Sequence, residues 1–162
     1  DFDKRIGIVQ SGAKLKQPPI GNYDSMSGIS ELTELISSMS PVLKEGEFVF
    51  CSASGSLTEY AHLDPVGTFI EAEGLTLTLQ AEVAEKAKIP FQSIYKQISL
   101  TVHSSLDAVG LTAAIATQLT SYDISANVVA GYYHDHIFVQ AEKAALAMQA
   151  LDELISSGQS SS

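Results

Sequence analysis

Apolar residues recur three and four positions apart in several stretches of the chain, which is the spacing of one face of an α-helix. The clearest stretches are residues 29–39, 111–119 and 144–155. A shorter one runs from Gln80 to Lys88 and is ended by Pro90, because proline cannot continue a helix. We therefore predict four helices.

Other stretches alternate apolar with polar residues, as strands with one buried face do. The segment EFVFCS at 47–52, for example, places two phenylalanines on one face and Val49 and Cys51 on the other. A polar loop is expected after this strand. The predicted strands are residues 47–52, 67–73, 75–79 and 93–103, followed by a hairpin of 125–133 and 136–140.

Two pairs of similar segments indicate an internal duplication. GISELTELIS, which begins at Gly28, parallels GLTAAIATQL, which begins at Gly110. LTLQAEVAEKA and IFVQAEKAALA share a Gln-Ala-Glu tripeptide at the point where a helix follows directly on a strand. The predicted units are residues 28–92 and 93–157, and residues 158–162 are expected to form a frayed tail.

Each predicted unit contains a helix, two strands and a second helix, and the strand at 93–103 joins the units. An antiparallel sheet with helices packed on one face buries such a set, so the predicted fold class is α+β. No strand follows the last helix, and the first unit lacks an opening strand unless Arg5–Gln10 supplies it. Because an unpaired apolar edge invites association, we expect the halves to complete each other, or a second chain to do so, and hence a homodimer.

The composition narrows the possible partners. Nineteen acidic and nine basic residues in 162 give a net charge of -10, which repels nucleic acid and anionic membrane surfaces. We therefore expect neither as a partner, and no apolar run is long enough to span a membrane. The single cysteine, Cys51, excludes an internal disulfide, so we expect a cytoplasmic protein in which Cys51 is a small core residue.

The first 27 residues differ in character from the rest of the chain. They carry four of the nine cations, including the only arginine, and three of the nineteen acids, whereas the remainder has a net charge of -11. Pro18 and Pro19 forbid a helix around them, and only Arg5–Gln10 has a strand-like pattern. Residues 1–27 are therefore expected to be a loosely attached arm, a leader, or a strand docked on the core.

Two parts of the sequence resemble the small tandem ACT-domain proteins. VHSSLDAVGLTAAIATQL followed by ISANVVAGYYHDHIFV is similar to their second unit, and SPVLKEGEFVFCS with TFIEAEGLTLTL is similar to their first. The resemblance covers about residues 28–156. It implies two ferredoxin-like βαββαβ units that pair their sheets, bind small effectors, typically amino acids, and need no cofactor.

The turn SSLDAVG at residues 104–110 is the candidate ligand site. The first amides of a helix have no partner within it, and the helix dipole adds about half a positive charge, so a carboxylate fits there. Gly110 lets a ligand approach the backbone, and two serine hydroxyls can bond to it. The same residue types also cap helices that bind nothing.

In the ACT units that the chain resembles, this junction faces a bound effector across an interface between subunits or domains. The resemblance thus extends the site to the strand beside the junction, and it leaves Asp107 to meet an ammonium group. Carried over by position, the candidate ligand-binding residues are Ser104, Ser105, Leu106, Asp107, Val109 and Gly110, with Asn127 and Val128 on the adjacent strand.

The tripeptide His134-Asp135-His136 has donors that suit zinc, and His103 or His62 would add another ligand. Its place at the tip of a predicted hairpin argues against a metal site, because the turn splays side chains two residues apart. His103 and Ser104 do not form a nucleophile and base, since adjacent strand residues point to opposite faces.

The sequence therefore predicts a non-enzymatic regulatory module, which binds a small amino acid or similar metabolite at the junction and signals to a partner. One alternative is a structural or interaction module that binds no ligand and dimerises through its sheets. A third is a metal-dependent enzyme that uses His103, His134 and His136.

Overall fold

The computed structural model describes residues 25–101 and 110–159. Its strands form one antiparallel seven-stranded sheet in the order β3-β4-β2-β5-β7-β6, with β1 paired to β5 off this path. The strands are β1 (Ser40–Leu43), β2 (Phe48–Ala53), β3 (Gly67–Glu71), β4 (Gly74–Gln80), β5 (Tyr95–Thr101), β6 (Asn127–Ala130) and β7 (Asp135–Gln140). The helices are α1 (Ser25–Ser38), α2 (Leu57–Tyr60), α3 (Ala81–Lys86), α4 (Leu111–Ser121) and α5 (Ala144–Gln159), with 3-10 turns η1 (Ala61–Leu63) and η2 (Ala141–Lys143).

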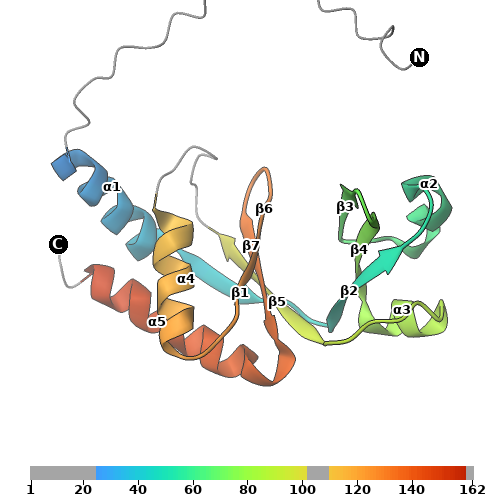
Figure 1. Cartoon of the computed structure of the whole chain (residues 1–162). Coiled ribbons are helices and arrows are strands. Elements are labelled where there is room, and N and C mark those ends of the chain that lie inside the picture. The colour runs from blue at the N-terminus through green and yellow to red at the C-terminus, as the bar shows by residue number, and fades with distance from the viewer. Residues whose placement is uncertain (1–24, 102–109, 160–162) are drawn as a thin grey trace, which may run out of the picture.

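The two halves of the sheet exchange their closing strands. β2 and β5 meet at the pair Phe48–Tyr95, so the start of β5 closes the sheet of the first half. From there β5 pairs with β7 on one side, and on the other side with β1, at Val42–Ser99 for example. The halves therefore complete each other, one of the two possibilities that the missing strands raised, and Figure 1 shows β1 and β5 crossing between them.

Strand β1 was not predicted from the sequence, although it is the missing strand of the second half. It has only four residues, too few to show a strand-like alternation, and one of them is Pro41. Proline is tolerated there because β1 pairs on one side only, so its missing amide costs no ladder hydrogen bond. The short helix α2 was likewise expected to be loop, since four residues are too few to show a helical period.

The internal repeat holds at one of its two predicted places. Gln80 and Gln140 have nearly the same backbone angles, φ -63 and ψ 138 against φ -53 and ψ 134. The next amide of each crosses to a neighbouring strand, with Ala81 donating to the Glu47 carbonyl at 2.8 Å and Ala141 to the Ile94 carbonyl at 3.0 Å. The predicted correspondence between the segments at Gly28 and Gly110 is wrong. In the second half, α4 lies between β5 and β6, and the helix at the equivalent place in the first half, between β2 and β3, is α2. Helix α1 instead packs against α5 and α4.

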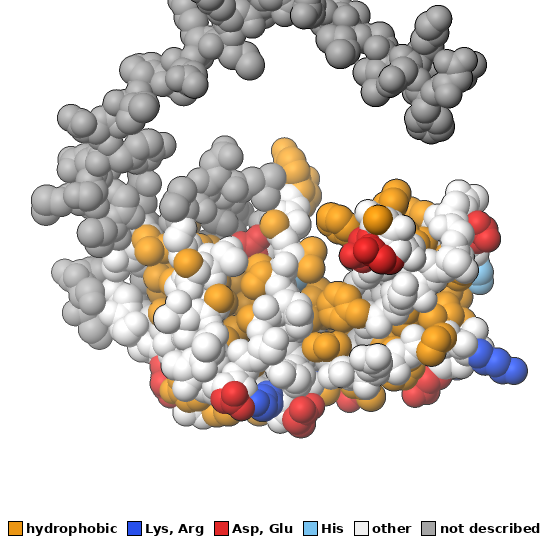
Figure 2. Space-filling view, in the orientation of Figure 1, with side chains coloured by type: hydrophobic (Ala, Val, Ile, Leu, Met, Phe, Trp, Pro, Cys, Tyr) orange, Lys and Arg blue, Asp and Glu red, His pale blue; other side chains and the backbone are white. Residues whose placement is uncertain are grey.

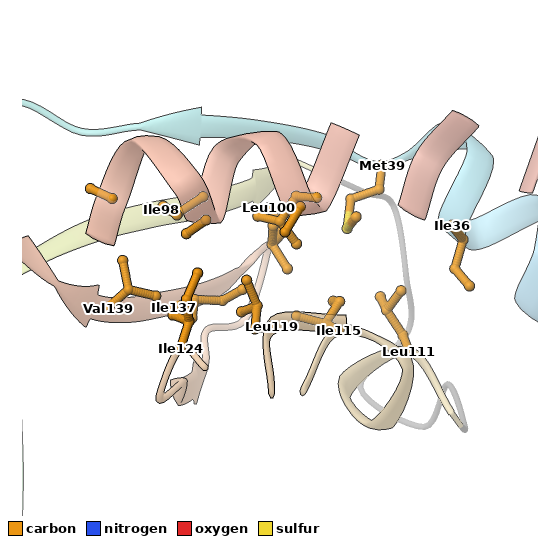
Figure 3. Packing of buried hydrophobic residues seen from close by; sticks show 14 residues of the cluster. Ile36, Met39, Ile98, Leu100, Leu111, Ile115, Leu119, Ile124, Ile137 and Val139 are labelled. Atoms are coloured by element: carbon orange, nitrogen blue, oxygen red, sulfur yellow. The ribbon is translucent and has the colours of Figure 1, made fainter. Parts of the chain in front are cut away.

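Two hydrophobic clusters lie between the sheet and its helices. The larger lies between β5 and β7 and the three helices α1, α4 and α5 (Figure 3). The smaller lies on β2 and β4 beneath α3, and the thiol of Cys51 is buried in it, as predicted. Burial also raises the pKa of Cys51. Helices on one face of an antiparallel sheet confirm the predicted α+β, ferredoxin-like class.

The opposite face of the sheet carries an aromatic cluster, which we define as Phe48, Phe50, Tyr95 and Phe138. Phe50 contacts Tyr95 and Phe138 edge-to-face, with ring centroids 5.2 Å and 5.3 Å apart, and Phe48 meets Phe138 at 5.8 Å. Edge-to-face pairs stabilise beyond the area they bury. Because β2 belongs to the first half and β7 to the second, the cluster joins the halves, and Figure 2 shows apolar side chains in the hollow between them.

The ends of the chain differ slightly from expectation. Helix α5 runs to Gln159 and so includes the first two residues of the predicted frayed tail, 158–162. Residues 1–24, which include the strand-like Arg5–Gln10, lie outside the described residues, as do 160–162. No helix in the described part of the chain is long and apolar enough to cross a bilayer.

Substitutions of two leucines in α5, one buried and one partly exposed, test the packing of the larger cluster. Leu151 is fully buried, whereas Leu146 is 39% exposed. Leu151→Ala leaves a cavity and should lower the free energy of unfolding by about 3 kcal/mol. Leu146→Ala should lower it by less than about 1 kcal/mol. Urea unfolding followed by circular dichroism measures both, and equal losses would contradict the packing.

Candidate functional site

The candidate site lies only partly within the described residues. Ser104, Ser105, Leu106, Asp107 and Val109 fall in the segment 102–109, outside them. Gly110, Asn127 and Val128 are described, so the structure bears on the start of α4 and on β6.

Gly110 directly precedes α4 and has a left-handed backbone, with φ 99, which explains the choice of glycine. Its carbonyl accepts the Ala114 amide at 2.9 Å, which closes the first helical turn. A Cβ on Gly110 would lie 3.1 Å from Cδ2 of Leu32 on α1. The space beside the glycine is thus filled by Leu32 of α1 and is not the open approach to the backbone that was expected.

The first turn of α4 nevertheless presents amide groups. The amides of Leu111, Thr112 and Ala113 have no carbonyl acceptor within the helix, as at every helix start. Leu111 points into the core, whereas Thr112 and Ala113 are exposed. This turn contains no acidic residue, so the positive end of the helix dipole is not neutralised from within the turn.

The two candidates on β6 do not lie beside Gly110. Asn127 pairs with Phe138, which in turn pairs with Gln97, whereas Ala130 lies level with Leu100 near the end of β5. Asn127 is therefore about 10 Å along the strand from the level of the junction. Its Nδ2 donates to the Phe138 carbonyl at 3.2 Å. Val128 points to the other face and packs against the larger cluster.

The first half contains a counterpart of this junction, between β2 and α2. Gly55 precedes the helix with φ 114, much as Gly110 does. Here, however, the Glu59 carboxylate accepts both the Ser56 amide, at 2.8 Å, and the Ser56 hydroxyl, at 3.0 Å. These bonds lower the pKa of Glu59, the amide bond most. A carboxylate of the chain itself thus occupies this helix start, whereas α4 has none in its first turn.

The sequence did not indicate a polar cluster that β5 and β7 bring together. The Nδ1 atom of His136 accepts the Gln97 amide at 3.2 Å and lies 2.9 Å from the hydroxyl of Ser99, which is 2% exposed. Burial lowers the pKa of His136, His134 and Lys44 lower it further, and Asp135 opposes them.

The histidines do not assemble a metal site in the described part of the chain. His136 turns to Ser99, the Nδ1 atom of His134 is buried without a partner, and His62 lies in η1 of the first half. No group of three or more metal-ligating side chains occurs among residues 25–101 and 110–159. His103 falls outside these residues.

Comparisons with known proteins found similar families and similar solved structures. Residues 27–96 and 92–153 match two family models, each described as an ACT domain. A structure from Vibrio cholerae, described as a protein of unknown function and possible transport protein, is 55% identical over 79% of this chain and 98% of that chain, with a TM-score of 0.74. The comparison with curated proteins found no match.

More distant solved structures share the fold. An Agrobacterium tumefaciens protein is 14% identical with a TM-score of 0.58, over 72% of this chain and 89% of that one. The ligand-free regulatory subunit of aspartate kinase from Thermus thermophilus is 10% identical with a TM-score of 0.55, over 70% of this chain and 95% of that one.

The environment of His136 predicts how stability depends on pH. Its pKa is lowered in the folded protein, so the unfolded chain binds the proton more readily. Stability should therefore fall as the pH drops through about 6.5, the ordinary histidine pKa. Urea unfolding at about pH 7.5 and about pH 5.5 gives the free energy of unfolding at each pH. This free energy should fall less between the two pH values in His136→Gln than in the wild type. The same change at exposed His62 is the control, and an equal effect of both would contradict the assignment.

Proposed function

Because the chain belongs to the ACT-domain family, we propose that it is a non-enzymatic regulatory module whose second half binds a small amino acid at the turn between β5 and α4. The observation that carries this proposal is the difference between the two helix starts. The Glu59 carboxylate fills the start of α2, whereas the first turn of α4 has no acid of its own. A ligand carboxylate at α4 would take the place that Glu59 takes in the first half.

The helix start alone does not provide enough affinity. A carboxylate at a helix N-terminus gains about 0.3 to 2 kcal/mol, whereas micromolar binding needs about 8 kcal/mol. We propose that the hydroxyls of Ser104 and Ser105 bond to the carboxylate and that Asp107 pairs with the ammonium group. Asn127 lies about 10 Å along β6 from the level of the end of β5, and we propose that it contacts the ligand from a second copy of the chain.

Transmission of the signal would use α1. Leu32 of α1 touches Gly110 at the entrance to α4, so a ligand at this turn bears on the contact between the two helices. If one arrangement of α1 binds the ligand better, occupancy shifts the population toward it. A separate target protein would then recognise the favoured arrangement. We place this exchange in the cytoplasm, where a buried free cysteine such as Cys51 stays reduced.

A homodimer is part of the proposal, because the outer strands β3 and β6 each pair on one side only within the described part of the chain. Strand β3 exposes Phe69 to 70% and Ile70 to 84%, and Val129 is exposed on β6. Exposed apolar side chains on an edge strand favour pairing with another chain. The same observation supports the second candidate function, an interaction module whose sheets assemble without a ligand.

A thermal-shift screen of the twenty amino acids tests the ligand. At 100 times its dissociation constant, a ligand adds about 2.7 kcal/mol of stability. For a chain of this size, that raises the Tm by roughly 5 to 10 °C. We expect one or a few amino acids to produce such a shift. A flat screen at millimolar concentrations would instead support the interaction module.

Exposed Thr112 provides a matched pair of variants for the site. Thr112→Glu places a carboxylate in the first turn of α4, which suits the helix dipole and so preserves the fold but repels a ligand carboxylate. We expect binding at least about tenfold weaker, a loss of about 1.4 kcal/mol. Thr112→Gln has nearly the same size without the charge and should bind as the wild type does. Equal titration curves for both variants would place the ligand elsewhere.

A further inference from the structure

A cavity lies where the chain passes from the first half into the second. Its volume is about 410 Å³, within the usual range for small-molecule sites. It lies at the side of the aromatic cluster, on the sheet face that carries Phe50 and Tyr95. It is lined by Phe50 and Ser52 of β2, by Pro90, Phe91, Gln92 and Ser93 of the linker, and by Tyr95 of β5.

The aromatic walls of this cavity are held in place before any ligand arrives. The rings of Phe50 and Tyr95 are nearly perpendicular, at 88°, so they form a corner. Phe50 also rests on Phe138 of β7 at 79°, which fixes its orientation from the second half. Both wall residues are half-buried, and a preformed corner costs a ligand little ordering free energy.

The charges around the cavity favour a cation. None of the seven lining residues carries a charge, so a ligand carboxylate would find no cationic partner among them. Thr76 pairs with Ser52 on the neighbouring strand, and its hydroxyl donates to the Glu71 carboxylate. The Glu71 carboxylate of β3 therefore reaches Thr76 of β4, the strand next to β2, on a chain with a net charge of -10. Aromatic faces add their own attraction for cations.

We propose that this cavity binds a small organic cation of the methylated ammonium class. The methyl groups pack against Phe50, Tyr95 and Phe91, and the charge is stabilised by the ring faces and by Glu71. The serine hydroxyls and the Gln92 amide at the rim are left to bond a polar substituent of the ligand. A ligand here bridges β2, the linker and β5, so its binding tightens the passage between the two halves.

A matched pair of probes tests the charge. Choline and its uncharged isostere 3,3-dimethylbutan-1-ol have nearly the same shape, so any difference in affinity reports the positive charge. We expect saturable binding of choline to the full chain, followed by NMR chemical shifts, and isostere binding weaker by roughly fivefold or more. Equal affinity of the two probes, or no saturable binding of choline, would overturn the proposal.

Variants then locate the binding. Phe50→Leu and Tyr95→Leu keep an apolar wall but remove an aromatic face, and each should weaken choline binding roughly fivefold or more while leaving the isostere unchanged. Phe69→Leu alters an exposed ring outside the cavity and should change neither. Thr112→Glu should also leave choline binding intact, so this site and the proposed amino-acid site can fail independently. Wild-type choline affinity in both wall variants would refute the assignment.

Discussion

The pairing of β1 with β5 is the contact on which the whole fold depends. Four residues from the start of the described chain fill the open edge of the second half, about sixty positions later in the sequence. The start of β5 likewise pairs with the edge of the first half, at the single pair Phe48–Tyr95. Neither half is complete alone, because each without the other leaves a row of unpaired backbone groups at a buried edge. The duplicated sequence therefore yields one interlocked sheet rather than two independent domains.

Most elements of this sheet could be predicted from the sequence, because long amphipathic stretches such as α5 and β7 show their period clearly. β1 could not be, since four residues with a proline show none, and only the missing partner of β5 pointed to it. Of the two pairs of similar segments, only one corresponds to equivalent places in the structure. Gln-Ala-Glu marks a strand-to-helix passage with a defined cross-strand bond, whereas the likeness of the segments at Gly28 and Gly110 reflects only a shared helical period.

The candidate site was predictable in its backbone and not in its surroundings. Gly110 was expected at the start of a helix, which α4 confirms, whereas its left-handed φ of 99 was not predicted. The place of Asn127 depends on the register of β6 with β7, which local sequence does not encode. Leu32 meets Gly110, and Ser99 meets His136, only through packing between distant segments. The aromatic cavity was hidden for the same reason, since its residues lie on β2, the linker and β5.

Duplication has let the two helix starts diverge. In the first half, Glu59 of the chain itself accepts the amide of the N-cap residue Ser56, which stabilises the start of α2. In the second half, the first turn of α4 contains no acid, and our proposal is that a ligand carboxylate binds there. Both proposed ligands act on segments that tie the halves together, α1 in one case and the linker with β5 in the other. A ligand bound as proposed at either place would act where the exchanged strands hold the halves together, because each half is closed by a strand of the other.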